Sequence, residues 1–327
     1  MALIRSGSTP NVTGVIERER VWRPSIIVGQ DRVVRRRGQL HPSHAWRVPV
    51  ISIIRRLPII IGAMSIFTMV TAAGMTSPAA AACGNTAGGF NAWLDDFRGR
   101  AAGAGISAKA IASGLNGVSY DPAIIRLDRN QHSFKLSFSA FYARRVDGGM
   151  IAKGRSLMSQ YGGTFDKIEA RFGVPREIIV AIWGLETNYG ANMGSKYSIV
   201  RSLATLAYDC RRSAFFTGQL LDALRIIQRG DMSVGQMRGG WAGEIGQTQF
   251  LPTPYVRYAV DFNGDGRRNL MSSPPDILAS TANFLKAHGW KAGQPYGPGS
   301  ANYGVLNDWN SAGVYQQTIA KMAAQMR

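Results

Sequence analysis

The sequence of 327 residues predicts a mainly α-helical protein with little β structure. From residue 83 onward, apolar residues recur with helical spacing in several segments. Glycine and proline residues lie where such segments begin or end, as at Gly173 and Pro175. Strand signals are nearly absent, because no hairpin dipeptide separates two alternating apolar runs. The length after residue 82 is enough for one large domain or two small ones.

The first predicted helix, Phe90–Arg100, places its large apolar residues on one stripe. Ser107 is expected to cap the second helix, which Gly114 and Gly117 end. Pro175 begins the helix that leads to Glu186. The remaining predicted helices are Ser137–Arg145, Met150–Tyr161, Phe165–Phe172, Arg176–Glu186, Ile199–Leu206 and Ala214–Arg229. A long loop is expected over Gly293–Ser300.

The first 82 residues do not have the pattern of a folded domain. Residues 1–56 contain eleven Arg and three acidic residues without hydrophobic periodicity, so we expect a basic, disordered leader. Residues 57–82 carry no charge, and an apolar run, Leu57–Ala73, precedes four alanines. Basic, apolar and small-residue regions in this order predict a secretory signal. A transmembrane anchor is the alternative, although the run is shorter than the ~20 apolar residues of a typical span.

The formal charge of +18 is shared between the leader and the rest of the chain. The leader carries +8 of it, which leaves +10 for residues 83–327. Long-range attraction to an anionic polymer such as the cell wall explains this charge in an exported protein. No nucleic-acid-binding motif is present, so nucleic acid is not an expected partner.

The two cysteines, Cys83 and Cys210, both follow the expected cleavage site. An even number of cysteines in an oxidising compartment suggests one disulfide between them. A lipidated Cys83 and a pair of free thiols are the alternatives.

Glu186 closes the apolar run that begins after Arg176 and precedes a polar turn, Thr187–Gly190. A poorly solvated carboxylate has a raised pKa and stays protonated near neutral pH, as a general acid for glycoside cleavage requires. The alternative is an ordinary helix-terminal Glu that faces water.

The segment Gly239–Pro252 contains four glycines, which allow a close approach of the backbone to a ligand. Gln247 and Gln249 offer amide groups suited to sugar hydroxyl and acetamido groups. A glycine-rich loop before a helix, without a ligand, is the alternative.

A third segment follows the EF-hand calcium loop, with oxygen-bearing side chains at positions 1, 3 and 5 and Gly266 at position 6. Position 12 is Ser272 rather than Glu, so Asp276 would have to close a longer loop. The predicted metal residues are Asp261, Asn263, Asp265, Arg267 and Asp276. A series of metal-free Asx turns is the alternative.

These segments resemble the membrane-bound lytic murein transglycosylases of the B family. Ala242–Pro252 is similar to the family motif Ala-Gly-x-x-Gly-x-x-Gln-Phe-x-Pro, and the stretch around Glu186 is similar to its catalytic segment. Asn307–Ser311 resembles a motif in which Trp309 stands for a Tyr and Asn310 matches. The family often has Ser at the position of Gly240. The resemblance covers about residues 87–325.

The resemblance implies a lysozyme-like catalytic core with additional helices. We expect one transglycosylase domain over residues 83–327, with a helical entry segment at about 87–150 and the core at about 151–290. Residues 291–327 would complete the cleft. Glu186 is the expected catalytic residue, and the expected substrate-binding residues are Tyr189, Gly240, Gln249, Trp309 and Asn310. Tyr189, Phe215, Phe216 and Trp241 are candidate stacking surfaces for sugars, with core packing as the alternative for each.

By the same resemblance, the enzyme would cleave the MurNAc–GlcNAc β-1,4 bond of peptidoglycan without water and leave 1,6-anhydroMurNAc ends. One Glu would act as acid and then as base, because no second carboxylate lies near Glu186 in the sequence. The alternatives are a hydrolytic muramidase of the same fold, with a second carboxylate, and a non-catalytic murein- or calcium-binding protein.

No cofactor is required by this scheme, and a structural calcium ion is the one metal expected. We expect a monomer that acts on peptidoglycan glycan strands in the periplasm after signal cleavage, with membrane anchoring as the alternative. A cell-wall synthesis or division complex is the further partner considered.

Overall fold

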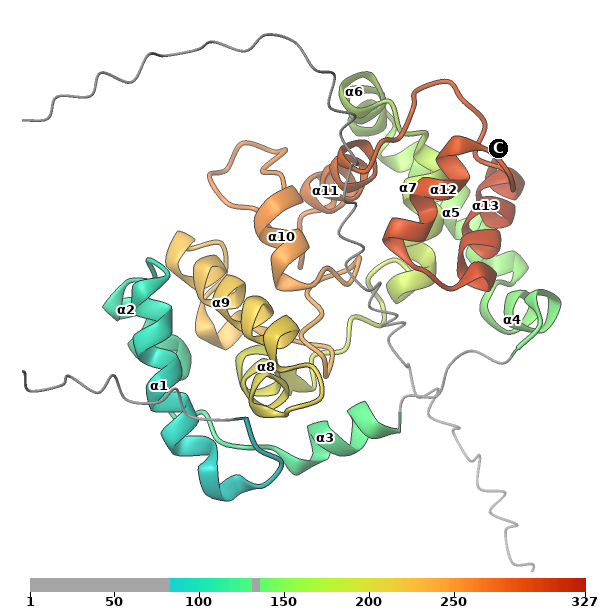
Figure 1. Ribbon diagram of the computed structural model, residues 1–327. Coiled ribbons are helices and arrows are strands. Elements are labelled where there is room, and N and C mark those ends of the chain that lie inside the picture. Colours follow the sequence, from blue (N-terminus) through green and yellow to red (C-terminus); the bar gives the residue numbers. More distant parts are fainter. Residues whose placement is uncertain (1–82, 131–135) are drawn as a thin grey trace, which may run out of the picture. The chain divides into compact units, whose positions relative to one another are not determined.

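The structure, a computed structural model, describes residues 83–130 and 136–327 (Figure 1). This part of the chain is mainly helical, which confirms the predicted fold class. The predicted leader and signal segment lie outside the described residues. The helices are α1 (Phe90–Gly103), α2 (Ala108–Leu115), α3 (Pro122–Arg129), α4 (Phe138–Arg145), α5 (Gly148–Gln160), α6 (Gly162–Phe172), α7 (Arg176–Thr187), α8 (Ile199–Tyr208), α9 (Ser213–Arg229), α10 (Pro252–Tyr258), α11 (Pro274–Ala287), α12 (Ala301–Trp309) and α13 (Gly313–Met326).

The described β structure consists of two short strands, β1 (Tyr197–Ser198) and β2 (Arg238–Gly239). They pair antiparallel, with Tyr197 opposite Gly239. Two 3₁₀ turns, η1 (Ala87–Gly89) and η2 (Val234–Gln236), complete the elements. The strand pair joins the segment after α7 to the glycine-rich segment, so it brings two predicted parts of the site together.

Every predicted helix is present, and the local signals act as expected. The Ser107 side chain accepts a hydrogen bond from the backbone N–H of Ala110 and so caps α2. Gly173 adopts a left-handed conformation, with φ of 71°, and ends α6. The predicted loop at Gly293–Ser300 is present between α11 and α12.

Helices α3 and α10–α13 are additional to those predicted. Several carry start signals in the sequence: Asp121 caps α3 directly before Pro122, and Ser300 caps α12. Proline also lies in the first turn of α10 and α11. Packing against neighbouring helices stabilises them, because most helical stability in proteins comes from tertiary contacts.

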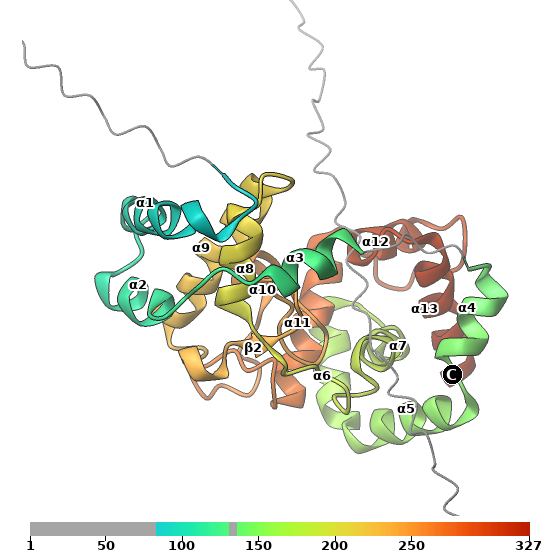
Figure 2. The ribbon, with the colours of Figure 1, turned by 90° about the horizontal axis from the view of Figure 1, so that it is seen from below.

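The helices pack in two groups that α10 and α11 connect (Figures 1 and 2). In the first group, α9 contacts α8, α2 and α10. In the second, α7 lies among α5, α11 and α13. The central position of α7 explains why the sequence is apolar over almost the whole helix.

The interior of α7 is fully buried. Ile178, Ile179 and Ile182 have no exposed surface, and burial of each such side chain contributes roughly 1.5–3 kcal/mol. Gly184 permits the close approach of α13, because a Cβ atom there would lie 2.9 Å from Cε of Met322. This packing fixes the end of α7, and therefore Glu186, between α12 and α13.

Candidate active site

Glu186 lies in the last turn of α7 and is only 8 % exposed. Burial disfavours the charged form and raises the pKa of this carboxyl group above its ordinary value. Its position at the carboxyl end of a helix acts in the same direction, because this end carries partial negative charge. A carboxyl group kept neutral in this way is suited to donate a proton to a leaving group.

Two donors from later parts of the chain meet at one oxygen of Glu186. The Tyr315 hydroxyl of α13 donates to Oε1 over 2.7 Å. The indole N–H of Trp309, at the end of α12, donates to the same oxygen over 3.0 Å. These bonds, together with the charge of Arg145, favour the carboxylate and offset part of the rise in pKa caused by burial.

Trp309, which the sequence predicts to bind substrate, contacts Glu186 directly in the structure. Its N–H binds Glu186, and its ring packs edge-on against Phe250 and Phe284, with centroids 5.5 and 5.1 Å away. Tyr315, which the sequence analysis does not identify, supplies a hydroxyl at the same place. Tyr315 lies in a helix without a local sequence motif, so its position at Glu186 follows only from the packing of α13 against α7.

The two glutamines of the glycine-rich segment differ in their contacts. Gln247 accepts from the indole N–H of Trp183 over 2.8 Å and donates to the carbonyl of Met271. Its amide thus connects α7 to the segment before α11. Gln249 donates to the carbonyls of Met193 and Gly246. Its buried Oε1 has no hydrogen-bond partner among the described residues.

The glycine-rich segment contains a second buried carboxyl group, Glu244. Glu244 is 2 % exposed, and its pKa is raised to about 7, mainly by burial and to a smaller extent by the charge of Glu186. Its Oε2 accepts the backbone N–H of Ala242 over 3.0 Å. The backbone N–H of Gly240 donates to the Glu244 carbonyl, so Gly240 belongs to the same turn. Glu244 lies 58 positions after Glu186 in the sequence, so the sequence spacing alone does not relate the two carboxyl groups.

Residues 89–300, which contain Glu186 and the whole glycine-rich segment, match the model of the transglycosylase SLT domain. The chain belongs to this family.

Two kinds of similarity to individual members of the SLT family accompany this match. The chain is 40 % identical over 144 residues to membrane-bound lytic murein transglycosylase B of Escherichia coli (strain K12), which covers 44 % of this chain and 39 % of that protein. The match thus spans about two-fifths of the length of that relative. SltB3 from Pseudomonas aeruginosa, solved in complex with NAG-anhNAM-pentapeptide, is 34 % identical with a TM-score of 0.68, covering 72 % of this chain and 79 % of that one.

A more distant structure supports the fold alone. The Escherichia coli lytic transglycosylase Slt35, solved in complex with calcium, is 24 % identical and has a TM-score of 0.63. The alignment covers 71 % of this chain and 92 % of that chain. This likeness confirms the predicted lysozyme-like core.

Tyr189 follows Glu186 by three positions in this SLT domain, and its side chain connects α7 to α5. Its hydroxyl donates to the carbonyl of Met150 over 2.8 Å, and burial raises its pKa. Phe216 and Trp241 are also buried, whereas Phe215 is half-buried and packs edge-on against Phe216. Core packing therefore accounts for Tyr189, Phe216 and Trp241 better than sugar stacking does.

Asn310 follows Trp309 and ends α12. Its Oδ1 accepts from the backbone N–H of Ala312 over 3.0 Å, and its carbonyl accepts from Gln316. The residue is 4 % exposed. It thereby sets the turn between α12 and α13, which carry the two donors to Glu186.

The predicted calcium loop is held by hydrogen bonds within the described chain. Asp261 accepts the backbone N–H groups of Gly264, Asp265 and Gly266. Asp276 is fully buried, and its two oxygens accept the N–H groups of Phe262, Asn263 and Asn269. Asp276 thus anchors the backbone of the loop through three N–H groups.

The remaining loop side chains also bind one another. Asn263 donates to Asp265 over 3.0 Å, and Asp265 accepts the backbone N–H of Arg267. Across residues 83–130 and 136–327, no three His, Cys, Asp or Glu side chains form a group that could hold a metal ion. In this arrangement the loop does not present a calcium-binding cage.

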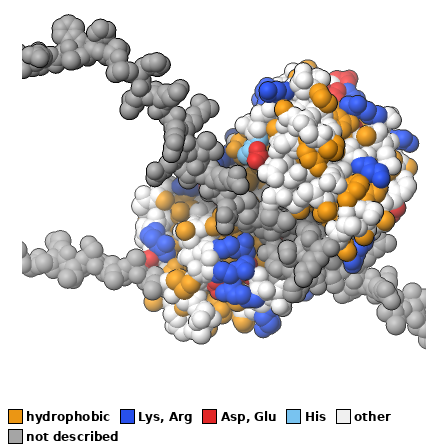
Figure 3. Space-filling view, turned by 45° about the vertical axis from the view of Figure 1, so that its right-hand side comes forward, with side chains coloured by type: hydrophobic (Ala, Val, Ile, Leu, Met, Phe, Trp, Pro, Cys, Tyr) orange, Lys and Arg blue, Asp and Glu red, His pale blue; other side chains and the backbone are white. Residues whose placement is uncertain are grey.

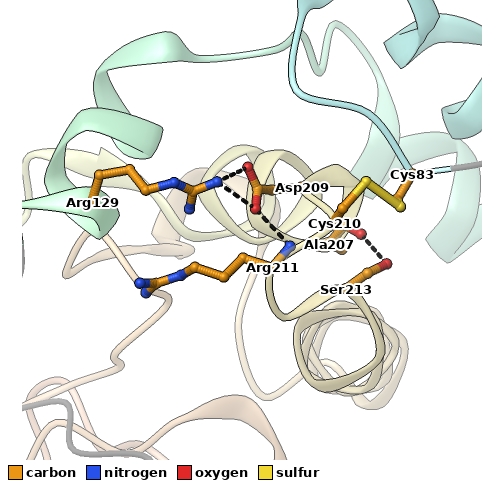
Figure 4. Close-up of a disulfide and its surroundings, with 7 residues drawn as sticks. All are labelled: Cys83, Arg129, Ala207, Asp209, Cys210, Arg211 and Ser213. Carbon is orange, nitrogen blue, oxygen red and sulfur yellow. Dashed lines mark hydrogen bonds and ion pairs between the residues drawn. A yellow bond between two sulfur atoms is a disulfide. The ribbon is translucent and has the colours of Figure 1, made fainter.

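Cys83 and Cys210 form a disulfide in the structure, with Cα atoms 5.0 Å apart (Figure 4). Beside it, Arg129 binds Asp209 through two hydrogen bonds, and the backbone N–H of Arg211 donates to the same carboxylate. The disulfide and this cluster attach the start of the described domain to the connection between α8 and α9.

Proposed function

We propose that this protein is a lytic transglycosylase that cleaves the MurNAc–GlcNAc β-1,4 bond of peptidoglycan and leaves 1,6-anhydroMurNAc ends. The observation that carries the proposal is the environment of Glu186. Its pKa is raised by burial, while Tyr315 and Trp309 donate to the oxygen that would bear charge after the proton has left. One group can thus act as acid in the first step and as base in the second.

In the first step, Glu186 would donate its proton to the glycosidic oxygen as the bond to C1 of MurNAc breaks. The acetamido group of the sugar would stabilise the oxocarbenium-like centre. In the second step, the Glu186 carboxylate would take the proton of the 6-hydroxyl as its oxygen bonds to C1. Glu186 is then protonated again, and no water is consumed.

Hydrolysis by a muramidase of the same fold is the second candidate, and the observation that favours it is Glu244. A hydrolase requires its second carboxylate to contact water or sugar. The Oε1 atom of Glu244 is buried, and its Oε2 is bound to the backbone N–H of Ala242. This burial supports transglycosylation over hydrolysis.

The partner proposed is the peptidoglycan glycan strand, and we propose that the protein acts as a monomer in the periplasm, with Glu186 and Gln249 as site residues. The face shown in Figure 3 carries more basic than acidic side chains, in keeping with the net positive charge of residues 83–327. Such a surface attracts an anionic polymer. None of the helices in the described part is long and apolar enough to cross a membrane.

Calcium binding by the Asp261 loop stays a prediction. Its support is the spacing of Asp261, Asn263 and Asp265. Calcium is present in the structure of Slt35, which is a fact about that protein. No catalytic step in the proposed mechanism involves the ion.

Digestion of purified murein sacculi by residues 83–327 tests the proposal. We expect soluble muropeptides lighter by one water than hydrolase products, without new reducing ends. A majority of reducing-end products would establish hydrolysis instead. Binding without release of muropeptides would establish a non-catalytic murein-binding protein.

A further inference from the structure

The hydrogen bond from Trp309 to Glu186 depends on the orientation of the indole ring. The indole N–H donates to Oε1 of Glu186 over 3.0 Å, while the ring packs edge-on against Phe250 and Phe284. An N–H···O bond weakens steeply as its angle departs from linearity. Residues that fix the ring of Trp309 therefore also act on the hydrogen bond to Glu186.

One of these rings, Phe284, is supported by His288. His288 directly follows α11, and its imidazole stacks on Phe284 with centroids 4.1 Å apart and 17° between the planes. The same Phe284 ring meets the indole of Trp309 at 5.1 Å and 83°. Phe284 is only 7 % exposed. It thus links the imidazole to the indole by direct contact.

His288 also binds the residue that precedes Trp309. Its Nδ1 lies 3.2 Å from Oδ2 of Asp308. A carboxylate is an acceptor, so Nδ1 carries the hydrogen and donates it. Asp308 and Trp309 are consecutive residues at the end of α12, and the contact therefore attaches the backbone that carries the indole to the end of α11.

Both sets of contacts from His288 lead to Trp309, one through a ring and one through the backbone. The side chains of His288 and Asp308 are 28 % and 46 % exposed, and ion pairs so close to solvent contribute little to stability. Tyr258 also packs edge-on against His288, at 5.4 Å. The Nε2 atom of His288 is buried and has no hydrogen-bond partner among the described residues, so stacking and the Nδ1 contact orient the imidazole.

We propose that His288 is a positioning residue that holds the indole N–H of Trp309 at Glu186. It acts through its two contacts, the stacked ring of Phe284 and the carboxylate of Asp308. The inference deepens the proposed function and rests on it, since it assumes that the Trp309 hydrogen bond assists proton transfer by Glu186.

Three substitutions of His288 separate the two contacts. His288→Phe keeps a ring that can stack on Phe284 and loses the bond to Asp308. His288→Asn keeps an N–H donor near the position of Nδ1 and loses the ring. His288→Ala loses both contacts, so it should have the largest effect.

The first readout is the separation of kcat from KM on a soluble murein glycan. We expect His288→Ala to lower kcat by about tenfold and to change KM by less than about twofold, because a positioning contact is expressed mainly in the transition state. His288→Phe and His288→Asn should each lose about threefold in kcat. Asp308→Asn retains an acceptor oxygen for the Nδ1–H group and should therefore lose less than Asp308→Ala.

The second readout is the environment of the indole itself. Labelling of the full chain with fluorotryptophan gives each tryptophan a ¹⁹F resonance, and Trp309→Phe identifies the one that belongs to Trp309. We expect this resonance to move or broaden in His288→Ala, because the indole loses its fixed orientation. Smaller changes should accompany His288→Phe and His288→Asn.

Asn302→Ala is the matched control for a general loosening of α12. Asn302 is fully buried in α12, and its side chain binds backbone groups of Lys291 and Gln294, seven positions before Trp309 in the chain. We expect this control to lower Tm while the Trp309 resonance and kcat stay close to those of the wild type. Equal changes in Asn302→Ala and His288→Ala would overturn the inference, as would an unchanged resonance or an unchanged kcat in His288→Ala.

The outcomes separate this inference from the proposed function. Anhydro products from the wild type, together with a wild-type Trp309 resonance in His288→Ala, would overturn this inference alone. Reducing-end products from the wild type would overturn the proposed function, whereas a displaced resonance and a lower kcat in His288→Ala would still support the role of His288, because a hydrolase also needs an oriented acid. Absence of cleavage by the wild type would overturn both.

Discussion

The hydroxyl of Tyr315 donates a 2.7 Å hydrogen bond to Oε1 of Glu186, although 129 positions separate the two residues. Both are almost completely buried. Burial alone would give Glu186 a proton that it could not easily release. The Tyr315 bond favours the charged form and so makes both protonation states of Glu186 accessible.

Replacement of Tyr315 by Phe should therefore slow murein cleavage by about 10- to 100-fold, because a hydrogen bond to a charged group is worth roughly 1.5–3 kcal/mol. The pKa of Glu186 should rise, so the alkaline limb of the rate profile should move to higher pH. Rate measurements across pH check both effects. Tyr296→Phe is the control, because Tyr296 faces Glu177, a carboxylate outside the site. Equal losses in both variants would contradict the role of Tyr315.

Glu186→Gln should abolish cleavage of sacculi while folding and murein binding persist, because proton transfer by a positioned side chain contributes roughly 10²–10⁴-fold in rate. Glu177→Gln is the matched control: Glu177 is equally buried at the other end of α7 but binds Arg327. We expect this control to keep its activity. Cleavage by Glu186→Gln within about tenfold of the wild type would exclude Glu186 as the acid.

Stability should depend on pH through Glu244. Its pKa rises from 4.5 to about 7 on folding, so the unfolded chain releases this proton first. The associated stability is present below about pH 4.5 and is lost as the pH rises to about 7, with a change of at most about 3 kcal/mol. Urea unfolding across this range should show a smaller pH dependence for Glu244→Gln than for the wild type. Parallel curves for the two proteins would contradict the raised pKa.

The disulfide should stabilise the protein. It joins residues 127 positions apart, and closure of a long loop restricts the unfolded chain. The double variant Cys83→Ser/Cys210→Ser should lose about 2–4 kcal/mol in urea unfolding. Mass analysis of a non-reduced tryptic digest should find the linked peptides. Two free thiols, or a lipid on Cys83, would show that the bond is not formed in the cell.

The spacing of the Asp261 loop predicts that millimolar calcium raises Tm, because a ligand bound only by the native state stabilises it. Asp265→Ala should remove this response, whereas Asp95→Ala, an exposed carboxylate on α1, should keep it. Asp276→Asn should lower Tm with or without calcium, since Asp276 anchors backbone N–H groups. An unchanged Tm in calcium would leave the loop as the metal-free turn that the structure describes.

Local sequence signals determined much of the fold. Helical periodicity, the Ser107 cap and the left-handed Gly173 placed the helices from α1 to α9, except α3, because these signals act between residues close in the chain. The apolar run of α7 likewise indicated Glu186, since a helix that is apolar all round must be buried. The glycine-rich segment marked a second part of the site for the same local reasons.

Only the tertiary structure decided what surrounds Glu186. Tyr315 and Trp309 reach it from α13 and α12, so no spacing in the sequence relates them to it. The same holds for the backbone partners of Tyr189 and Asp276, which come from distant parts of the chain. The sequence by itself determined which side chain could serve as the acid; packing decided its pKa, because that value depends on desolvation and on charges and donors brought together from distant positions.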